Sequence, residues 1–587
     1  MHEFTVWAPK ANRMAVKTDD GVYPMEGPDG SGWWSAKIDS AGPGTDYAFL
    51  LDDDPTPYPD PRGASQPKGV HGPSRVVDHK AFHWNDTKWQ GPPLSGAVIY
   101  ELHIGTFTQD GTFDAAIEKL EHLCKLGITH IELMPVAAFP GEFGWGYDGV
   151  ALFAVREEYG GPEGLKRLVN ACHQQGIGVL IDVVYNHFGP VGSYANKFGP
   201  YMTNRHHTPW GDAVNFEEAG SDEVRRFFCD NAVMWMRDYH VDGLRLDAVH
   251  EFVDRSAIHF MEQLSAEVDV MSSTLGRRLV LIAESDLNDP RVVTPREARG
   301  YGMDAQWSDD FHHSLFTLLW CDPGRGYYDD FGTMDDLAKS LKQVFVYDGV
   351  YSGYRRHRHG RPVEGLSAHH FLGYIQNHDQ VGNRAVGERL EHLVGIDAAK
   401  VALGIVLTAP FVPMLFMGEE FAASTPFLYF TDHEDAEMRR LVAEGRKRDF
   451  AAFGWDEAQI PNPEDPETFE RSKLNWSEIH EGRHECMFEW VKELIHLRRT
   501  KVALNDGDLG HLKIACREED KFLVMERGPM RILANLGDQA VKIDLNEGES
   551  LRLSSRKDIV LAAGEVALPK MSFAILERSE NQQRSER

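Results

Sequence analysis

Eight short apolar segments, separated by stretches with helical periodicity, constrain the fold of this chain more than any other feature of its sequence. The segments start at residues 97, 129, 177, 241, 278, 302, 370 and 411 and read AVIYEL, THIELMP, IGVLIDVVY, VDGLRLDAV, RLVLIAES, GMDAQWS, HFLGYIQN and FVPMLFMG. Nearly continuous apolar runs of this length are typical of strands buried on both faces. Strands that alternate with helices are predicted to form a parallel sheet.

The stretches between these segments carry the helical pattern. Leu165, Leu168 and Cys172 fall on one helix face, Gly176 stands where that helix should end, and Ser221 is predicted to cap a later helix. Eight parallel strands with intervening helices predict a (β/α)8 barrel, in which reactive residues lie at the carboxyl ends of the strands. A doubly wound open sheet is the alternative, but no GxGxxG motif follows an early strand.

The regions on either side of this central part have a different sequence pattern. Before it, short β-rich runs such as FTVWAP and GWWSAKI alternate with Asp, Gly and Pro clusters, which predicts an antiparallel β-sandwich over residues 1–90. After it, runs such as HLKIACRE and SFAILER predict a second β-sandwich over residues 503–587, with a polar tail. A chain of 587 residues is too long to fold around one hydrophobic core, so we expect a multidomain chain with the barrel at residues 91–502.

The amino-acid composition limits the classes of partner and the cellular location expected of this chain. The 91 Asp and Glu against 61 Lys and Arg give a formal net charge of −30, which disfavours binding to nucleic acid and to anionic membranes. The six cysteines show no CxxC pair or metal-ligand spacing, so we expect reduced thiols. The start MHEFTVWAPK has no signal-peptide pattern, and no apolar stretch is long enough to span a membrane. We therefore expect a cytoplasmic protein.

Three acidic residues stand where predicted strands end. Asp247 follows the fourth segment's apolar run, Glu284 the fifth, and Asp379 comes just after the seventh. Cleavage of a glycosidic bond with retention needs a carboxylate and a carboxylic acid about 5–5.5 Å apart, which neighbouring strand ends can supply. An unpaired carboxylate is too costly to serve as core filler, although each residue singly could cap a helix or join an ion pair.

A basic residue is predicted beside the first of these acids. Arg245 lies two residues before Asp247, so both side chains point to the same face of the strand. A cation in that position keeps the neighbouring carboxylate ionised and orients it. A buried ion pair inside the barrel is the structural alternative, and the two roles are compatible.

Taken together, the segments DVVYNH, GLRLDAVH, AESD and NHDQ resemble the four signature regions of the α-amylase superfamily of retaining glycosidases and transglycosylases. The resemblance implies that Asp247 is the nucleophile, Glu284 the general acid and base, and Asp379 a third carboxylate that binds sugar hydroxyls. It further implies substrate contacts at Asp182, His187, Arg245, His250, His378, Gln380 and Asn383.

Some of these residues could equally have an ordinary structural role. A histidine at a strand end, such as His187 or His378, is often a core residue, and only the adjacent acidic residues favour contacts with sugar oxygens. Trp145 and Tyr147 follow the second segment within GEFGWGYDGV. An aromatic pair is usually core, but the likeness to the superfamily's GYD segment favours a sugar platform at Tyr147.

A narrower resemblance, to the family of maltooligosyltrehalose trehalohydrolases, extends over nearly the whole chain. It is carried by FTVWAPKA, YELHIGTFTQDGTF, DAQWSDDFHHSL and PMLFMGEEFAASTPFLYFTDH. This family resemblance implies hydrolysis of the α-1,4 bond next to the terminal trehalose of maltooligosyltrehalose, with sugar contacts at Asp309 and His313. A helix start capped by Ser308 is the structural alternative for that run. For Glu419 and Glu420 we expect structural roles in a loop.

Three rivals share much of this pattern. Glycogen branching enzymes have the same N-terminal sandwich and GLR-x-DAV motif, but AESD and NHDQ differ from the pattern expected of them. Isoamylase-type debranching enzymes differ more. A noncatalytic glucan-binding protein is disfavoured because all three carboxylates and Arg245 are retained. We expect no metal or other cofactor in catalysis, because the chemistry needs none and residues 188–216 are poor in carboxylates.

Overall fold

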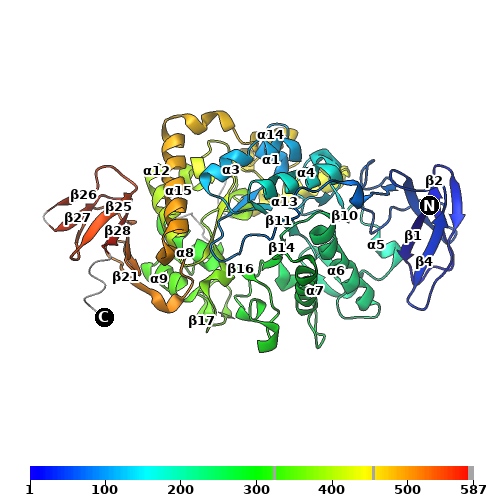
Figure 1. Ribbon diagram of the computed structural model, residues 1–587, viewed down its shortest axis with the longest axis horizontal. Coiled ribbons are helices and arrows are strands. Elements are labelled where there is room, and N and C mark those ends of the chain that lie inside the picture. Colours follow the sequence, from blue (N-terminus) through cyan, green and yellow to red (C-terminus); the bar gives the residue numbers. More distant parts are fainter. Residues whose placement is uncertain (321–325, 452–456, 563, 580–587) are drawn as a thin grey trace.

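The centre of the molecule is a closed parallel β-barrel (Figure 1). A computed structural model describes residues 1–320, 326–451, 457–562 and 564–579. The barrel strands follow one another in chain order: β7 (Ile99–Leu102), β8 (His130–Leu133), β11 (Gly178–Val183), β14 (Gly243–Leu246), β15 (Val280–Ala283), β16 (Ala305–Trp307), β19 (Phe371–Gly373) and β20 (Val412–Phe416). Each of the eight predicted segments supplies one strand, which confirms the predicted barrel.

Helices connect and follow the barrel strands (Figure 1). The longer ones are α4 (Gly161–Gln174), α6 (Ser221–Asp238), α7 (Phe260–Leu275), α8 (Asp309–Leu319), α9 (Met334–Gln343), α12 (Ile396–Thr408), α13 (Ala436–Ala451) and α15 (Gly482–Thr500). The shorter ones are α1 (Ile104–Phe107), α2 (Phe113–Ile117), α3 (Leu120–Leu126), α5 (Ala195–Phe198), α10 (His378–Gly382), α11 (Leu390–Val394) and α14 (Pro466–Arg471).

The connection from β15 to β16 departs from the expected pattern. Residues 284–304 are described throughout and contain only the 3-10 turns Pro290–Val292 and Arg296–Ala298. Pro290 and Pro295 lack a backbone N–H to donate within a helix. The expectation of an α-helix between every pair of strands is therefore wrong here.

Two predicted helix caps also differ from the structure. Ser221 is the first residue of α6, and Gly220 takes the capping position with φ of 87°. Ser308 does precede α8, but its hydroxyl donates to the carbonyl of Val344 (3.3 Å) and makes no side-chain cap. Tertiary contacts have replaced the local hydrogen bond that the sequence pattern suggested.

The interior of the barrel has an apolar layer beneath a polar one. Ile99, Leu180, Ile282, Leu372 and Met414 belong to one buried cluster inside the ring of strands. Along a strand, every second side chain faces the same side of the sheet. The residues two positions closer to the carboxyl ends therefore also point into the barrel and form its next layer. That layer carries the charged residues of the site described below.

The loops at the barrel ends hold three small antiparallel ladders. These are β9 (Ala137–Ala138) with β10 (Ala151–Val155), β12 (Met202–Thr208) with β13 (Gly211–Val214), and β17 (Asp348–Ser352) with β18 (His357–Gly360). The second ladder lies within the segment 188–216, the stretch noted above as poor in carboxylates. Such insertions account for the length of the barrel region.

Separate β-sheets lie at the two ends of the long axis (Figure 1). The N-terminal end has β1 (His2–Trp7) paired with β4 (Trp33–Ile38), and a sheet of β3 (Gly21–Pro24), β2 (Met14–Thr18), β5 (Asp46–Leu51) and β6 (Ser74–Arg75). The C-terminal end has β21 (Leu512–Arg517), β22 (Phe522–Arg527), β23 (Met530–Asn535), β28 (Ser572–Arg578) and β25 (Glu549–Ser554), and a sheet of β24 (Val541–Asp544), β27 (Glu565–Leu568) and β26 (Val560–Ala562). Most of the predicted polar tail, residues 580–587, lies outside the described residues.

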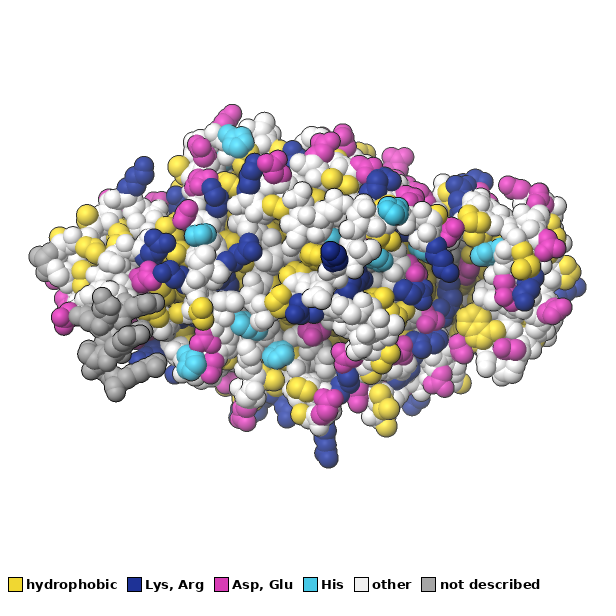
Figure 2. Space-filling model, viewed as in Figure 1, with side chains coloured by type: hydrophobic (Ala, Val, Ile, Leu, Met, Phe, Trp, Pro, Cys, Tyr) yellow, Lys and Arg dark blue, Asp and Glu magenta, His cyan; other side chains and the backbone are white. Residues whose placement is uncertain are grey.

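Charges of both signs are mixed on one face of the molecule (Figure 2). On the face shown in Figure 2, Lys and Arg side chains alternate with Asp and Glu, and the basic side chains do not gather into one continuous stripe. Within the described part of the chain, no helix combines the length and apolar character needed to cross a bilayer.

Candidate active site

The three acids predicted at strand ends meet at the carboxyl end of the barrel. Asp247 directly follows β14, Glu284 directly follows β15, and Asp379 is the second residue of α10, just beyond β19. β14 and β15 are hydrogen-bonded neighbours, with Leu246 paired to Ala283, so the first two carboxylates stand side by side. Their placement follows from where each apolar strand ends.

Arg245 joins these carboxylates. Its guanidinium is fully buried, and Nη1 donates to Asp182 Oδ2 at 2.6 Å and to Asp247 Oδ1 at 2.8 Å. Its Nη2 lies 2.9 Å from Glu284 Oε2. One planar cation thus holds three acidic side chains in fixed positions.

The two strand-end acids have opposite electrostatic environments. Burial by itself favours the neutral form of Asp247, but Arg245 and the amide of Asn186 overcome it and lower the pKa below its usual value. Burial raises the pKa of Glu284 to about 8, with Asp247 and Asp379 adding to the effect against the opposing charge of Arg245. At neutral pH the first is therefore a carboxylate and the second a carboxylic acid, the pairing that acid–base chemistry requires.

Local hydrogen bonds fix both groups. The Nδ2 of Asn186 donates to Asp247 Oδ2 at 2.8 Å and also to the Asp247 carbonyl. The backbone N–H of Ala248 donates to Glu284 Oε2 at 2.8 Å. Ala248 has φ of 40°, a left-handed conformation that turns the chain sharply after the strand and brings this N–H to the carboxyl.

Asp379 is held by the short helix α10. The Asn377 side chain caps this helix by accepting from the N–H of Gln380 (2.8 Å), and the Nδ2 of Asn383 donates to Asp379 Oδ1 at 3.1 Å. Loss of surrounding water raises the pKa of Asp379, while His378 opposes the rise. The side chain of Asp379 is partly exposed, so its carboxyl group remains open to a ligand.

His378 is tied to the barrel floor. Its Nδ1 lies 2.5 Å from Glu101 Oε1, and its backbone N–H donates to Glu101 Oε2 at 2.8 Å. Burial would lower the pKa of this imidazole, but Glu101 raises it to about 9. The hydroxyl of Tyr147 lies 2.8 Å from His378 Nε2 and donates to Asp182 Oδ2 at 2.6 Å. His378 and Asp182 are thereby connected through one phenol.

His187 also lines the site and contacts Tyr147. Its Nε2 is 3.1 Å from the carbonyl of Tyr147, and its Nδ1 contacts the side-chain oxygen of Asn186. Burial lowers the pKa of His187, so it is neutral near pH 7. The indole of Trp210, from the turn between β12 and β13, stacks on its ring with centroids 4.7 Å apart and an interplanar angle of 9°. Trp210 is about half exposed and lines the site cavity.

These side chains surround an open cavity of about 410 Å³. Most of the predicted site residues line it: Tyr147, His187, Asp247, His250, Glu284, His378, Asp379 and Asn383. Trp145, Asp148, Trp210, Ala248, Tyr429, Phe430 and Thr431 complete the lining. Asp182 and Arg245 are instead buried beneath the floor, where they support Asp247 rather than face the cavity.

Three further residues that were predicted to contact sugar have other partners in the structure. Asp309 accepts from the hydroxyl of Tyr374 at 2.5 Å, and burial raises its pKa. His313 packs against Tyr327, with ring centroids 5.3 Å apart, and burial lowers its pKa to about 3. Gln380 Oε1 accepts from the hydroxyl of Tyr328 at 3.1 Å. The structure brings none of the three onto the lining of the cavity, and their contact with sugar stays a prediction.

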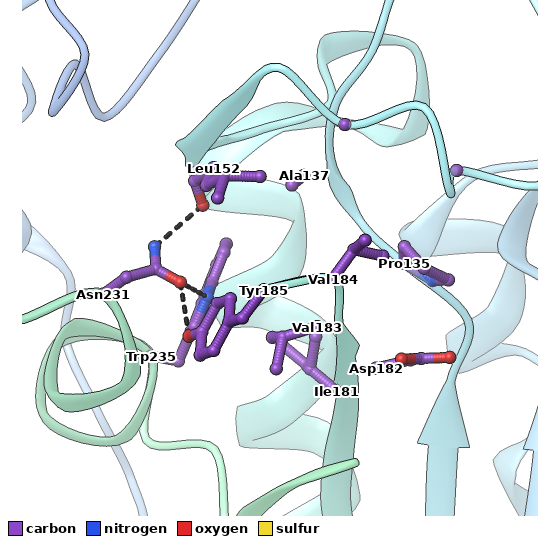
Figure 3. Close-up of a pocket in the computed structure, with 12 residues that line it drawn as sticks. Pro135, Ala137, Leu152, Ile181, Asp182, Val183, Val184, Tyr185, Asn231 and Trp235 are labelled. Carbon is purple, nitrogen blue, oxygen red and sulfur yellow. Dashed lines mark hydrogen bonds between the residues drawn. The ribbon is translucent and has the colours of Figure 1, made fainter. Parts of the chain in front are cut away.

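The strand that carries Asp182 is anchored from behind (Figure 3). On the outward side of β11, Asn231 of α6 donates to the carbonyl of Leu152 (2.9 Å) and accepts from Tyr185 Oη (2.6 Å) and Trp235 Nε1 (3.0 Å). Figure 3 shows Asp182 on the far side of the strand from this group. The packing therefore fixes the inward direction of the Asp182 carboxylate.

Sequence reasoning missed several residues of the site. Asn186 lies inside the quoted segment DVVYNH, and its place in a strand-end motif was a usable signal. Glu101 is an acid inside an apolar strand, which is also a signal because such burial is costly. Trp210 has no signal in the sequence, since its stacking depends on how the β12–β13 ladder folds over the barrel.

The loop after β20 contains buried acids with structural contacts. Glu420 accepts from the Tyr100 hydroxyl at 3.1 Å and lies 2.8 Å from His122 Nε2, and Glu419 accepts from the N–H of Phe416 at 3.0 Å. Both are used in packing, as predicted. Within the described ranges, no group of three or more His, Cys, Asp or Glu side chains is arranged to hold a metal ion.

A closed parallel barrel with an arginine-bound carboxylate and a neutral carboxylic acid at its rim defines the catalytic domain of an α-amylase-type glycosidase. The alpha-amylase catalytic-domain family matches residues 73–208. A solved structure described as a putative alpha amylase from Salmonella typhimurium superposes with a TM-score of 0.89 at 34% identity, covering 98% of this chain and 97% of that one.

Curated relatives refine the class. A malto-oligosyltrehalose trehalohydrolase from Rhizobium sp. (strain M-11) is 46% identical over 98% of this chain and 97% of its own length. A 1,4-alpha-glucan branching enzyme from Bacillus caldolyticus is 27% identical over 83% of this chain. The chain belongs to the malto-oligosyltrehalose trehalohydrolase family.

Proposed function

We propose that this chain hydrolyses the α-1,4-glucosidic bond next to the terminal trehalose of maltooligosyltrehalose and releases trehalose and a maltooligosaccharide. The observation that carries the reaction is the different protonation state of two adjacent acids: Asp247 is ionised beside Arg245, and Glu284, with a pKa of about 8, is protonated. The substrate is inferred from family membership. A carbohydrate-cleaving role follows from the class alone.

In the first step, Glu284 donates its proton to the glycosidic oxygen on the trehalose side while an oxygen of Asp247 attacks the anomeric carbon. The bond from that carbon to the glycosidic oxygen breaks, trehalose leaves, and a glycosyl ester forms on Asp247. Glu284 is now ionised and removes a proton from water, whose oxygen attacks the same carbon and displaces Asp247. Two inversions give net retention, and both carboxyl groups return to their starting state.

The surrounding residues have supporting roles in this proposal. Asp379 and His378, which line the cavity with Asp247 and Glu284, bind hydroxyls of the cleaved sugar and strengthen their contacts as positive charge grows. Tyr147 and Trp210 present aromatic surfaces suited to the apolar faces of pyranose rings. Contacts at Asp309 and His313 remain part of the proposal for the trehalose side.

Product analysis tests this function. The wild-type protein is incubated with maltooligosyltrehalose, and the products are separated by chromatography. We expect trehalose and a maltooligosaccharide shorter by two glucose residues, and no trehalose from a Glu284→Gln protein that binds the same substrate. Glucose or maltose as the main product, without trehalose, would reject the substrate assignment but leave the glycosidase class intact.

A branching activity is the second candidate, supported by the more distant branching relative. Incubation with amylose distinguishes branching from hydrolysis. A branching enzyme lowers iodine staining without releasing reducing ends, because it transfers the glycosyl group to another glucan rather than to water. We expect no such loss of staining.

Cytoplasmic location, and the absence of nucleic-acid or membrane partners, belong to the same proposal. They are supported by the net charge of −30 and by the described cysteines, Cys124, Cys172, Cys229, Cys486 and Cys516, none of which forms a disulfide. The division into residues 1–90, 91–502 and 503–587 is likewise proposed, on the change from antiparallel sheets to the barrel and back.

A further inference from the structure

Glu132 is a buried acid that the proposed chemistry does not use. It lies on β8, is 1% exposed, and is paired in register with Glu101 on β7 and with Leu180 on β11. Leu180 belongs to the cluster inside the barrel, so Glu132 points inward beside it. Among the residues that the structure describes, neither Oε1 nor Oε2 of Glu132 has a hydrogen-bond partner.

Other polar atoms inside the barrel share this property. In the described chain, Arg245 Nε, Asp182 Oδ1 and Trp307 Nε1 are also buried without a hydrogen-bond partner. The guanidinium of Arg245 stacks on the indole of Trp307, 4.3 Å from its centroid. These atoms belong to groups that meet at Arg245, since Trp307 stacks on its guanidinium, Asp182 accepts a hydrogen bond from it, and Glu132 lies close enough to interact with its charge. Buried polar groups of this kind are ordinarily satisfied, and ordered water with two to four partners is the usual means.

We propose that Glu132 is a positioning residue, which holds Arg245 in place from below through ordered water enclosed inside the barrel. The water accepts from Arg245 Nε and Trp307 Nε1 and donates to Glu132 and Asp182 Oδ1. Glu132 acts on the reaction only through Arg245. The inference rests on the catalytic roles proposed above for Asp247 and Glu284.

The chemistry of Glu132 suits this role. Burial raises its pKa well above the usual value, and Glu101 adds to the rise, so the side chain is a neutral acid that both donates and accepts. The charged groups that face it are Glu101 on β7, Asp182 on β11, Arg245 on β14 and His378 on α10. A second carboxylate charge at this depth would compete with Asp247 and Glu284 for the same guanidinium.

The position of Arg245 matters because three acids depend on it at once. Its Nη1 contacts Asp182 and Asp247, and its Nη2 contacts Glu284. Without support from below, the guanidinium can turn about its long side chain, and a displacement of about 1 Å can cost about 100-fold in rate. The pKa of Asp247 would rise as well, since Arg245 is the main group that lowers it.

The test compares Glu132→Gln, Glu132→Leu and a matched control, Ile282→Val. Ile282 is buried in the same barrel and is paired in register with Arg245, but it has no polar group. Glutamine keeps a donor and an acceptor, whereas leucine keeps the volume alone. For each protein, kcat, KM, the pH profile of kcat/KM and Tm are measured, and a high-resolution crystal structure is determined for the wild type and Glu132→Gln.

We expect Glu132→Leu to lose about 100-fold in kcat with KM little changed. The acid limb of its pH profile of kcat/KM should move to higher pH. Glu132→Gln should stay within about threefold of wild type, and Ile282→Val should lower Tm without moving either limb. Ordered water should contact Glu132 and Arg245 Nε. A Glu132→Leu protein with wild-type limbs, an equal loss in Glu132→Gln, or crystal structures without that water would each overturn the proposal.

Failure of this inference can be told apart from failure of the proposed function. Asp247→Asn and Glu284→Gln are assayed beside the Glu132 variants. If both remain active, the catalytic assignment itself is wrong. If both are inactive while Glu132→Leu behaves as wild type, the assignment stands and only the role of Glu132 is rejected.

Discussion

At the scale of single residues, one guanidinium separates the charge states of two acids. Arg245 contacts both Asp247 and Glu284, yet the pKa of the first is lowered while burial raises that of the second to about 8. The difference arises because Asp247 also accepts two hydrogen bonds, from Arg245 and Asn186, whereas Glu284 has more of its environment set by desolvation and by neighbouring carboxylates. Similar side chains therefore acquire different roles from position alone.

These charge states predict the pH dependence of the reaction. The active form has Asp247 ionised and Glu284 protonated. Activity should therefore fall as pH rises through about 8, where Glu284 loses its proton, and fall at acid pH only below the usual pKa of an aspartate. Measurement of kcat/KM against pH checks this, since it reports the ionisations of the free enzyme. Glu284→Gln should lower kcat at least about 100-fold and abolish the alkaline limb. An unchanged limb in that variant would refute the assignment of Glu284.

The site could be predicted from sequence only where the signal was local. Asp247, Glu284 and Asp379 were found because an acid at the end of an apolar strand is costly to bury and seldom serves as core filler. The Trp210 contact and the depth of Asp182 depend on loops and strands that are remote in sequence. Glu132, in contrast, has the same sequence signal as Glu101, an acid between apolar residues of a barrel strand.

At the scale of elements, the linker before the barrel is clamped beneath it by a buried charge network. His173 of α4 has Nδ1 2.8 Å from Asp86 Oδ2 and Nε2 2.9 Å from Asp242 Oδ2. His240 Nδ1 lies 2.7 Å from the same Asp86 oxygen, and Trp89 Nε1 donates to Asp242 at 2.7 Å. Trp89 and His173 also stack, with centroids 4.4 Å apart. Two linker residues are thus tied to the start of β14 and the end of α4.

The clamp should stabilise the protein within a defined pH range. Burial opposes ionisation of Asp86, but the two histidines lower its pKa, so its contribution is present above the usual aspartate value and lost as pH falls through the lowered one. Burial likewise opposes protonation of His173, but Asp242 and Asp86 raise its pKa, so its contribution is present below about 6.5 and lost as pH rises through the raised value. Stabilisation is therefore greatest between about pH 4 and 6.5.

Asp86→Asn tests the clamp. The substitution leaves two histidines beside an uncharged amide and should cost about 3–5 kcal/mol near pH 6, with a smaller cost at higher pH as His173 loses its proton in both proteins. Calorimetric Tm values over a pH series measure this. Asp19→Asn, at an exposed turn of the N-terminal sheets, is the control and should change Tm little. A Tm difference for Asp86→Asn that does not vary with pH would contradict the account.

The elements themselves were predicted unevenly. All the barrel strands were found, because runs buried on both faces carry a strong apolar signal. The short strands β3, β6, β26 and β27 were not, since they are partly exposed and span only two to four residues. The helix expected between β15 and β16 is absent because prolines interrupt that connection.

At the scale of the whole molecule, the substrate is decided by the loops above the barrel rather than by its floor. The three acids and Arg245 fit any retaining attack on an α-glucoside. Selectivity must come from residues around the opening, among them His250, Trp210 and Tyr429. Only tertiary structure brings these together, so sequence motifs identify the reaction more securely than the substrate.

Comparison of two substrates of equal length tests the central claim most directly. The ratio of kcat/KM for maltooligosyltrehalose to that for the matching maltooligosaccharide isolates recognition of the terminal trehalose from general binding of glucan. We predict a ratio above about 10 with trehalose as the product, because contacts to the trehalose unit should stabilise the transition state. Equal values for the two substrates would contradict it and would make this chain a general α-amylase.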